Sequence, residues 1–286
     1  MTSRIDPPPF VATLDAARAH NHSRLCVGLD PDPAALPPGF LGPTGIARFC
    51  DEIISATADL VCAYKPNLAF FERWGPEGLE ALAEVVAVVP KHIPVIADAK
   101  RGDIGNTSRA YAQAVYEQLG AAACTVSPYL GADAVAPLLD HPAGFAFVLC
   151  RTSNPGAGAL QDLAVGDEPL YASVLRLFAP WLDVERAGVV IGAREAAAFG
   201  WAARLAPKAQ ILVPGIGAQG GTVEELAAAL TPDQAARVIV NAGRSIIHCD
   251  SGSNFAASAR RAARDLSDHL ERELSAVGER RGHRAV

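Results

Sequence analysis

Short apolar runs recur along the chain, and helical patterns separate most of them. The interiors of the runs are apolar without alternation, which is typical of parallel strands covered on both faces. We predict strands at Arg24–Asp30, Val61–Asn67, Pro94–Lys100, Cys124–Tyr129, Phe145–Thr152, Gly188–Ala193, Gln210–Gly217 and Arg237–Arg244. This pattern predicts an α/β fold of the (β/α)8 barrel type, because an open doubly wound sheet fits so many regularly spaced units less well.

Helical periodicity accounts for the segments between the strands. We expect helices within Thr44–Leu60, Glu77–Val89, Thr107–Leu119, Arg194–Leu205 and Thr222–Leu230. Thr222 is followed three residues later by Glu225, which predicts a capping box. An amphipathic helix at Phe10–His20 precedes the first strand, and a closing helix follows the last one. Residues 1–278 are therefore predicted to form one barrel domain, and the polar residues 279–286 a disordered tail.

Composition and charge exclude several classes of protein. The chain has 286 residues, 50% of them apolar, and its formal net charge is −6. This balance argues against nucleic-acid binding, which needs clustered basic residues. The sequence shows neither a membrane-length apolar stretch nor a secretory signal in its first ten residues, so we expect a cytoplasmic protein without a membrane partner. The six cysteines include no C-x-x-C pair, and no metal site is predicted.

Candidate chemistry gathers at the carboxyl ends of the predicted strands, where the catalytic groups of such barrels lie. The polar residues at these ends are Asp30, Lys65, Asp98, Lys100, Ser153, Gln219 and Arg244. The chain contains only four lysines, and two of them are in this set. Because arginine supplies most of the basic residues, a lysine at a strand end indicates a need for a compact, titratable ammonium group.

The strongest signal is the sequence Asp98-Ala99-Lys100-Arg101-Gly102-Asp103. Strand side chains alternate, so Asp98 and Lys100 should point to the same side and enter the barrel mouth together. Burying these charges costs desolvation energy unless they pair. A plain salt-bridge cluster at the barrel rim is the alternative, and Lys65 on the neighbouring strand argues against it.

Two glycine-rich turns indicate a phosphate site. Residues 214–221 (PGIGAQGG) end the seventh predicted strand, and Gly243 and Arg244 end the eighth. Phosphate sites in these barrels are commonly built from these two loops. Glycine lets backbone N–H groups approach an anion, and Arg244 can add a bidentate charged contact.

Together, these motifs resemble those of the orotidine 5'-phosphate decarboxylase family. The resemblance rests on Asp98-x-Lys100-x-x-Asp103, Lys65 in YKPN, PGIGAQGG and GRS, in the family's order, and covers nearly the whole barrel. The runs YKPNLAFFE and RGDIGNT are similar to the longer bacterial branch, type 2. The resemblance implies decarboxylation of orotidine 5'-monophosphate (OMP) to UMP and carbon dioxide, the last step of de novo UMP biosynthesis, with neither cofactor nor metal.

The resemblance also implies catalytic roles for individual residues. Lys100 would protonate C6 of the pyrimidine as carbon dioxide leaves. Asp98 would lie against the substrate carboxylate, and Lys65 would hold the ribose and orient Asp98. Asp103 and Thr107 would reach into the active site of the other subunit of a homodimer.

The implied binding residues surround these groups. Asp30 would bind a ribose hydroxyl and Ser153 the pyrimidine edge. Gln219 and Arg244, with Gly243 in the same turn, would bind the phosphate.

The family mechanism fits the charge pattern. Loss of carbon dioxide at C6 leaves a carbanion that cannot delocalise into the ring, so its stabilisation must be electrostatic. A fixed ammonium group at Lys100 would stabilise this carbanion and then deliver the proton. Asp98 and Asp103 should keep Lys100 protonated, and Asp98 also implies repulsion of the substrate carboxylate.

Three other hypotheses remain. A magnesium-dependent sugar-phosphate decarboxylase or aldolase can share the D-x-K-x-x-D motif, although Lys65 would disfavour a metal there. A Schiff-base aldolase could use Lys100. A catalytically inactive barrel could only bind a nucleotide or a partner, but the intact charged set does not favour that hypothesis.

Overall fold

The computed structural model describes residues 9–217 and 220–282, and it confirms the (β/α)8 barrel. Eight parallel strands form one sheet in the order β2-β1-β10-β9-β8-β5-β4-β3. They are β1 Leu25–Leu29, β2 Ala63–Pro66, β3 Ile96–Arg101, β4 Ala123–Val126, β5 Ala146–Arg151, β8 Ala187–Ile191, β9 Gln210–Pro214 and β10 Val238–Ala242. Each strand overlaps one of the predicted runs.

The sheet closes between its two end strands, β2 and β3. Isolated parallel bridges join Tyr64 to Val95 and Asn67 to Asp98. The backbone N–H of Leu68 also donates to the carbonyl of Asp98 at 3.3 Å. These contacts turn the sheet into a barrel, and they place the ends of β2 and β3 side by side.

Helices cover the outside of the barrel. They are α2 Pro43–Thr57, α3 Ala69–Glu72, α4 Pro76–Val88, α5 Gly105–Ala112, α6 Ala132–Leu139, α8 Leu170–Leu182, α9 Ala196–Leu205, α10 Val223–Ala229, α11 Pro232–Arg237, α12 Arg244–Ile247 and α13 Phe255–Gly282. Short helical turns extend α2 at Ala58–Leu60 and α5 at Gln113–Gln118. The predicted capping box is confirmed, because the Thr222 hydroxyl accepts from the N–H of Glu225 at 3.1 Å and the Glu225 carboxylate accepts from the N–H of Thr222.

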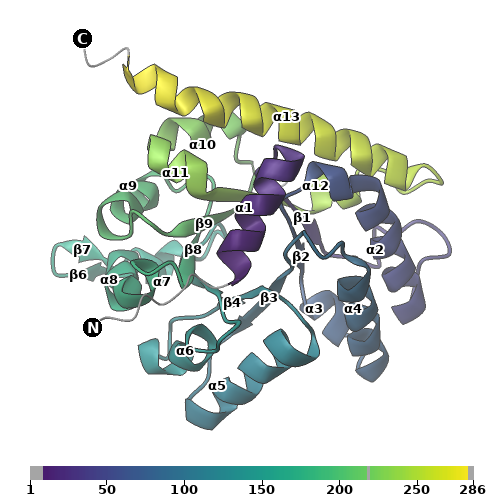
Figure 1. Cartoon of the computed structure of the whole chain (residues 1–286), viewed down its shortest axis with the longest axis horizontal. Coiled ribbons are helices and arrows are strands. Elements are labelled where there is room, and N and C mark those ends of the chain that lie inside the picture. Colours follow the sequence, from purple (N-terminus) through teal and green to yellow (C-terminus); the bar gives the residue numbers. More distant parts are fainter. Residues whose placement is uncertain (1–8, 218–219, 283–286) are drawn as a thin grey trace.

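The closing helix α13 is longer than predicted. It packs against α2, α10, α11 and α12, and crosses one side of the barrel (Figure 1). The helix ends at Gly282, so residues 279–282 belong to it rather than to a disordered tail. Residues 283–286 of the predicted tail lie outside the described residues. No helix in the described part of the chain has both the length and the apolar character needed to cross a membrane.

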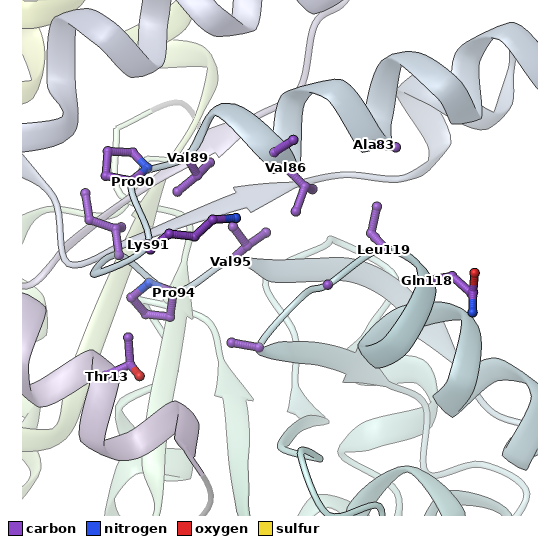
Figure 2. A pocket seen from close by; sticks show the side chains of 14 residues that line it. Thr13, Ala83, Val86, Val89, Pro90, Lys91, Pro94, Val95, Gln118 and Leu119 are labelled. Atoms are coloured by element: carbon purple, nitrogen blue, oxygen red, sulfur yellow. The ribbon is translucent and has the colours of Figure 1, made fainter.

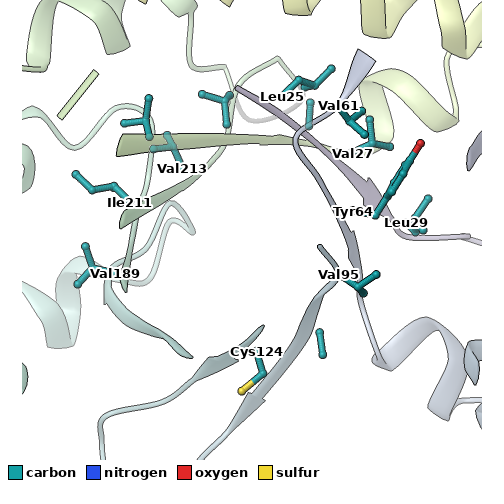
Figure 3. Close-up of a cluster of buried hydrophobic side chains, with 14 of the residues drawn as sticks. Leu25, Val27, Leu29, Val61, Tyr64, Val95, Cys124, Val189, Ile211 and Val213 are labelled. Atoms are coloured by element: carbon teal, nitrogen blue, oxygen red, sulfur yellow. The ribbon is translucent and has the colours of Figure 1, made fainter. Parts of the chain in front are cut away.

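Apolar side chains on both faces of the strands explain the absence of alternation in the sequence. Leu25, Val27 and Leu29 of β1 belong to the large cluster between the strands and the helices, which Figure 3 shows in part. Cys26, between them, belongs to a second cluster inside the barrel. Both faces of each strand are thus buried, as in other parallel sheets.

The N-terminal helix α1 (Pro9–Asn21) covers one end of the barrel (Figure 1). The ring of Phe10 lies 4.5 Å from that of Phe145 and 5.6 Å from that of Phe147. The guanidinium of Arg18 donates to Gln210 at 3.0 Å and to the carbonyl of Val238 at 2.8 Å. This end is sealed by packing, so an open site is expected at the other end.

The loop between β5 and α8 is folded, although the sequence analysis predicted no structure for it. It contains the short helix α7 (Gly158–Gln161) and an antiparallel hairpin of β6 (Ala164–Val165) and β7 (Glu168–Pro169). Arg151, at the end of β5, donates to both carboxylate oxygens of Asp162, at 2.8 and 3.0 Å. These two hydrogen bonds hold the segment that contains α7 against the barrel mouth.

Candidate active site

A cavity of about 470 Å3 opens at the carboxyl ends of the strands. Five of the predicted site residues line it, namely Asp30, Lys65, Asp98, Lys100 and Ser153. The apolar part of its wall comes from Leu149, Val190, Leu212 and Pro214. The cavity therefore offers a charged side and an apolar surface suited to a flat ring.

Asp98 is held between the two lysines of the site. Its Oδ2 accepts a hydrogen bond from Lys65 Nζ at 2.5 Å, and its Oδ1 accepts one from Lys100 Nζ at 2.6 Å. The side chains of Lys65 and Asp98 are 6% and 10% exposed, whereas that of Lys100 is 53% exposed. Lys65 is thus a buried, fixed cation, and Lys100 presents its ammonium group to the cavity and to solvent.

Lys100 reaches Asp98 through an irregular backbone rather than through simple strand alternation. Its φ is +48°, a left-handed conformation that is costly for a residue with a Cβ. The register of β3 against β4 shifts between Ala97 and Arg101, so the pairing of the two strands is irregular there. The predicted meeting of the two side chains is confirmed, but its geometric reason was incomplete.

Thr125 supports this irregular backbone, and the sequence analysis did not identify it. Its hydroxyl accepts from the N–H of Lys100 at 3.0 Å and donates to Asp98 Oδ1 at 2.9 Å. A polar residue within the apolar run of β4 was the available signal. Thr125 therefore fixes both the strained backbone at Lys100 and the carboxylate of Asp98.

The charges of this trio shift the pKa values of its members. Burial alone would raise the pKa of Asp98, but the ammonium groups of Lys65 and Lys100 outweigh burial and hold it well below its usual value. Burial alone would lower the pKa of Lys65, but the carboxylates of Asp98 and Asp30 raise it above the usual value. Asp98 is therefore ionised and Lys65 protonated at neutral pH.

Asp30 is a second acid in the cavity, in a different environment. Its Oδ1 is buried and has no hydrogen-bond partner within residues 9–217 and 220–282. Burial raises the pKa of Asp30, against the opposing effect of Lys65. A Cβ on Gly243 would lie 3.2 Å from Asp30 Oδ2, so the absence of a side chain there leaves room for this carboxylate. An unpaired buried acceptor of this kind fits a donor on a ligand, such as a hydroxyl group.

The loop between β5 and α8 contributes part of the cavity wall, which the sequence analysis did not identify. The side-chain oxygen of Gln161 accepts from the N–H of Thr152 at 2.8 Å, and its amide donates to the Thr152 hydroxyl at 3.0 Å. Asn67, Asn154 and Asn241 also line the cavity. Asn67 ends a predicted strand and Asn154 follows one, which was a usable signal. Asn241 lies within the last predicted strand, and no local pattern marks Gln161.

The predicted phosphate turns lie at one edge of the mouth. Gly215, Gly217 and Gly220 have φ values of +105°, +76° and +81°, which favour glycine. Arg244 is exposed at the start of α12, and its guanidinium makes no hydrogen bond or ion pair to the described residues. Gln219, the other predicted phosphate residue, lies outside the described residues.

Asp103 and Thr107 do not line the cavity of their own chain. Asp103 lies between β3 and α5, where its Oδ1 accepts from the N–H of Ile104 at 2.8 Å. Thr107 is in the first turn of α5, and both residues are partly exposed. The side chain between them, Ile104, is 59% exposed. The structure thus places these residues at the partly exposed surface rather than in the lining of this cavity.

A cavity beside α4 makes an informative contrast. It measures about 340 Å3, and Lys91, Pro94 and Thr13 are among its lining residues (Figure 2). Lys91 is the only ionisable residue among the described residues that line it. It thus lacks opposed acids and bases, which the cavity at the strand ends provides.

The donor set of the active-site cavity suits an anionic ligand better than a metal ion. Among the described residues its carboxylates are Asp30 and Asp98, and both oxygens of Asp98 already accept from ammonium groups. Magnesium prefers several free oxygen ligands. Fold and site together define the class: a (β/α)8 barrel with a lysine–aspartate–lysine array in the cavity at its mouth.

Comparisons with known proteins agree with this class. The model of the orotidine 5'-phosphate decarboxylase / HUMPS family matches residues 23–260. Orotidine 5'-phosphate decarboxylase of Roseiflexus castenholzii is 48% identical over 271 residues, which are 94% of this chain and 99% of that protein. The protein of the same name from Thermomicrobium roseum is 47% identical over 279 residues, covering 96% and 99%. The structure of Leishmania donovani OMP decarboxylase has a TM-score of 0.81 at 36% identity and covers 93% of this chain and 98% of that one.

The chain therefore belongs to the orotidine 5'-phosphate decarboxylase / HUMPS family. Its relatives at 43–48% identity carry the decarboxylase name, which makes the chain an enzyme of the carboxy-lyase class.

Proposed function

We propose that this protein converts OMP to UMP and carbon dioxide without a metal or a prosthetic group. The observation that carries the proposal is the clamping of Asp98 between Lys65 and Lys100 at 2.5 and 2.6 Å, beside an apolar wall. The pyrimidine ring would lie against this wall with C6 and its carboxylate toward the charged trio. We place the reaction as the last step of de novo UMP formation, in the cytoplasm.

The proposed chemistry breaks one carbon–carbon bond and forms one carbon–hydrogen bond. The bond between C6 and the carboxylate breaks, carbon dioxide leaves, and the electron pair stays on C6. The ammonium group of Lys100 stabilises this pair and then transfers a proton to C6, which leaves Lys100 as a neutral amine. Its 53% exposed side chain can regain a proton from solvent.

Asp98 and Lys65 would act on the same step in different ways. Asp98 holds the ammonium group of Lys100 close through their 2.6 Å hydrogen bond, and its carboxylate would also repel that of the substrate. Stabilisation of the carbanion is the larger effect, since it acts where charge develops in the transition state. Lys65 is buried against Asp98, so it would orient that carboxylate and reach the ribose without delivering protons.

The remaining groups of the site would bind the rest of the nucleotide. The unpaired oxygen of Asp30 would accept a hydrogen bond from a ribose hydroxyl. Ser153 lines the cavity beside the apolar wall and would contact the pyrimidine edge. Gln219, Gly243 and Arg244 would bind the phosphate, with the glycine turns presenting backbone N–H groups.

We further propose that the enzyme is a homodimer with shared active sites. Asp103 and Thr107 lie outside their own cavity, on a surface where Ile104 is exposed. In the dimer, Asp103 and Thr107 would complete the site of the partner subunit, and Asp103 would add a second carboxylate near Lys100. Burial of Ile104 in the interface would contribute to association.

The decisive experiment measures carbon dioxide release from OMP by EDTA-treated protein. The wild type should turn over, and Lys100→Ala should lose turnover while still binding UMP. Lys208→Ala is the matched control, because Lys208 is an exposed lysine away from the cavity. Substantial turnover by Lys100→Ala would refute its role as the acid.

The carbon dioxide assay, together with two further measurements, distinguishes the alternative functions. Loss of wild-type turnover on EDTA treatment, with recovery on adding magnesium, would indicate the metal-dependent class. Trapping of a covalent adduct by borohydride with substrate would indicate a Schiff base on lysine. Absence of any turnover, with UMP bound, would indicate an inactive nucleotide-binding barrel.

A further inference from the structure

We propose that the side-chain NH2 group of Asn154 donates a hydrogen bond to the C4 carbonyl oxygen of the pyrimidine, and that Gln161 orients Asn154 through Thr152. Asn154 is thus a specificity-determining residue and Gln161 a positioning residue. This inference rests on the proposed function, because it concerns the base of the same substrate. Asn154 and Gln161 both line the cavity that holds Lys100, and both belong to the loop between β5 and α8.

The backbone N–H of Thr152 determines which way the carboxamide of Gln161 points. This N–H lies 2.8 Å from Gln161 Oε1, and because a backbone N–H can only donate, this end of the carboxamide must be the oxygen. The other end, Gln161 Nε2, donates to the hydroxyl oxygen of Thr152 at 3.0 Å. Gln161 thus holds both the backbone and the hydroxyl group of Thr152.

The hydroxyl group of Thr152 in turn orients Asn154. A hydroxyl group has one proton, and Thr152 Oγ1 already accepts from Gln161 Nε2. The closer acceptor for its proton is Asn154 Oδ1 at 2.7 Å, compared with 3.2 Å to Gln161 Oε1. The atom of Asn154 that faces Thr152 is therefore its oxygen, and this assignment follows step by step from one backbone N–H.

The NH2 group of Asn154 is left for a ligand. Asn154 Nδ2 makes no hydrogen bond to residues 9–217 or 220–282, and the residue lies at the exposed rim of the cavity. An amide NH2 group can only donate, so it fits a carbonyl oxygen of a ligand and not an amino group. A base that contacts Asn154 must therefore offer an acceptor there.

The order of the strands indicates which ring atom faces Asn154. In the closed barrel β1 and β5 lie opposite each other, because three strands separate them in either direction. Asp30, which would bind the ribose, follows β1, and Asn154 follows β5. The ribose is attached to N1, and C4 lies across the pyrimidine ring from N1. The carbonyl group at C4 would therefore point toward Asn154.

The position of the reactive trio agrees with this orientation. Lys65 lies on β2, and Asp98 and Lys100 lie on β3, so the trio is on one side of the line from β1 to β5. With N1 toward β1 and C4 toward β5, the ring can turn either C6 or C2 to that side. The proposed reaction requires C6 there, and the C2 carbonyl group then faces away from the trio. One placement of the ring thus satisfies Asp30, the trio and Asn154.

The test compares binding of UMP and CMP to the full-length protein by calorimetry. The two nucleotides share the ribose and the phosphate but differ at C4, where UMP has a carbonyl group and CMP an amino group. For Asn154→Leu, which keeps nearly the shape of the side chain, we expect the Kd for UMP to rise about three- to tenfold, because a neutral hydrogen bond is lost. The Kd for CMP should stay within about twofold of wild type or fall, because its amino group has no such hydrogen bond to lose.

Gln161→Leu tests the positioning role. It removes both hydrogen bonds to Thr152 but keeps Asn154, so the Kd for UMP should rise by a similar factor while that for CMP should not. In the double variant Gln161→Leu/Asn154→Leu the two losses should not add, because Asn154 is no longer there to be oriented. Additive losses would overturn the positioning role of Gln161.

Asn254→Leu is the matched control, because Asn254 is an exposed asparagine outside the cavity. Its Kd values for UMP and CMP should equal those of wild type. The comparison of the two asparagine variants removes any general effect of replacing an exposed amide by an apolar side chain.

The ratio of the Kd for CMP to the Kd for UMP decides the inference. An equal ratio in Asn154→Leu and wild type would overturn it, and an equal loss of both affinities would indicate a structural role. Wild-type protein that binds CMP as tightly as UMP would overturn it as well. Failure of the wild type to release carbon dioxide from OMP would instead refute the proposed function, and because binding is measured without turnover, the two failures are distinguishable.

Discussion

Replacing Asp98 by asparagine tests whether the charged trio is held together as described. Asp98→Asn keeps the shape of the side chain but removes the carboxylate that accepts from Lys65, Lys100 and Thr125. Lys65, whose side chain is 6% exposed, then keeps Asp30 as its nearby carboxylate among the residues that the structure describes. Removing one partner of a buried ion pair costs about 3–5 kcal/mol, because the other charge stays buried.

We expect this loss in the free energy of unfolding at pH 7, measured by urea denaturation at one fixed protein concentration. At about 2–4 °C per kcal/mol, it corresponds to a fall in Tm of roughly 6–20 °C. Asp51→Asn is the matched control, since Asp51 is exposed on α2, and its Tm should stay near that of wild type.

The pH dependence supplies a second measurement. The folded-state pKa of Asp98 is well below its unfolded value of about 3.9, so its contribution is complete above that value and is lost as the pH falls toward the folded-state pKa. The stability difference between wild type and Asp98→Asn should therefore shrink below about pH 4. A Tm for Asp98→Asn within about 2 °C of wild type at pH 7 would refute the reasoning.

Three further predictions concern other parts of the molecule. Asp30→Asn should raise the Tm of the ligand-free protein and weaken UMP binding, because burial raises the pKa of Asp30 and disfavours its charge; a lower Tm would contradict this. Lys100→Ala and Asp103→Asn, each inactive alone, should regain OMP turnover when mixed, since a hybrid dimer contains one intact site; no recovery despite proven subunit exchange would argue against shared sites. Gly188→Ala should lower the Tm in thermal denaturation, because its Cβ would lie 2.6 Å from the carbonyl of Gln210 and from the ring of Phe147, and an unchanged Tm would show that the strands can separate there.

The barrel and most of its charged centre were predictable from local pattern. Strands buried on both faces leave continuous apolar runs, and the residue at the end of each run marks the barrel mouth. This is why Lys65, Asp98 and Lys100 could be placed together without coordinates.

Other features depend on contacts between separate elements, which the local pattern does not predict. Gln161 enters the cavity wall because α7 folds back onto Thr152, and the Arg151–Asp162 fork holds it there. The left-handed backbone of Lys100 is fixed by Thr125 on the next strand. Neither feature has a signature in its own segment, since each is imposed by a partner nine or more residues away on another element.

The reactive groups also take part in closing the barrel between β2 and β3. The two strands meet there through isolated bridges, and Lys65 lies on β2 while Asp98 lies on β3. The hydrogen bond between Lys65 and Asp98 spans the place where the barrel closes, so the reactive centre forms only when β2 and β3 have come together. A chain that has not closed the barrel therefore lacks an assembled active site, and we expect local opening between β2 and β3 to abolish activity even where the other strands stay paired.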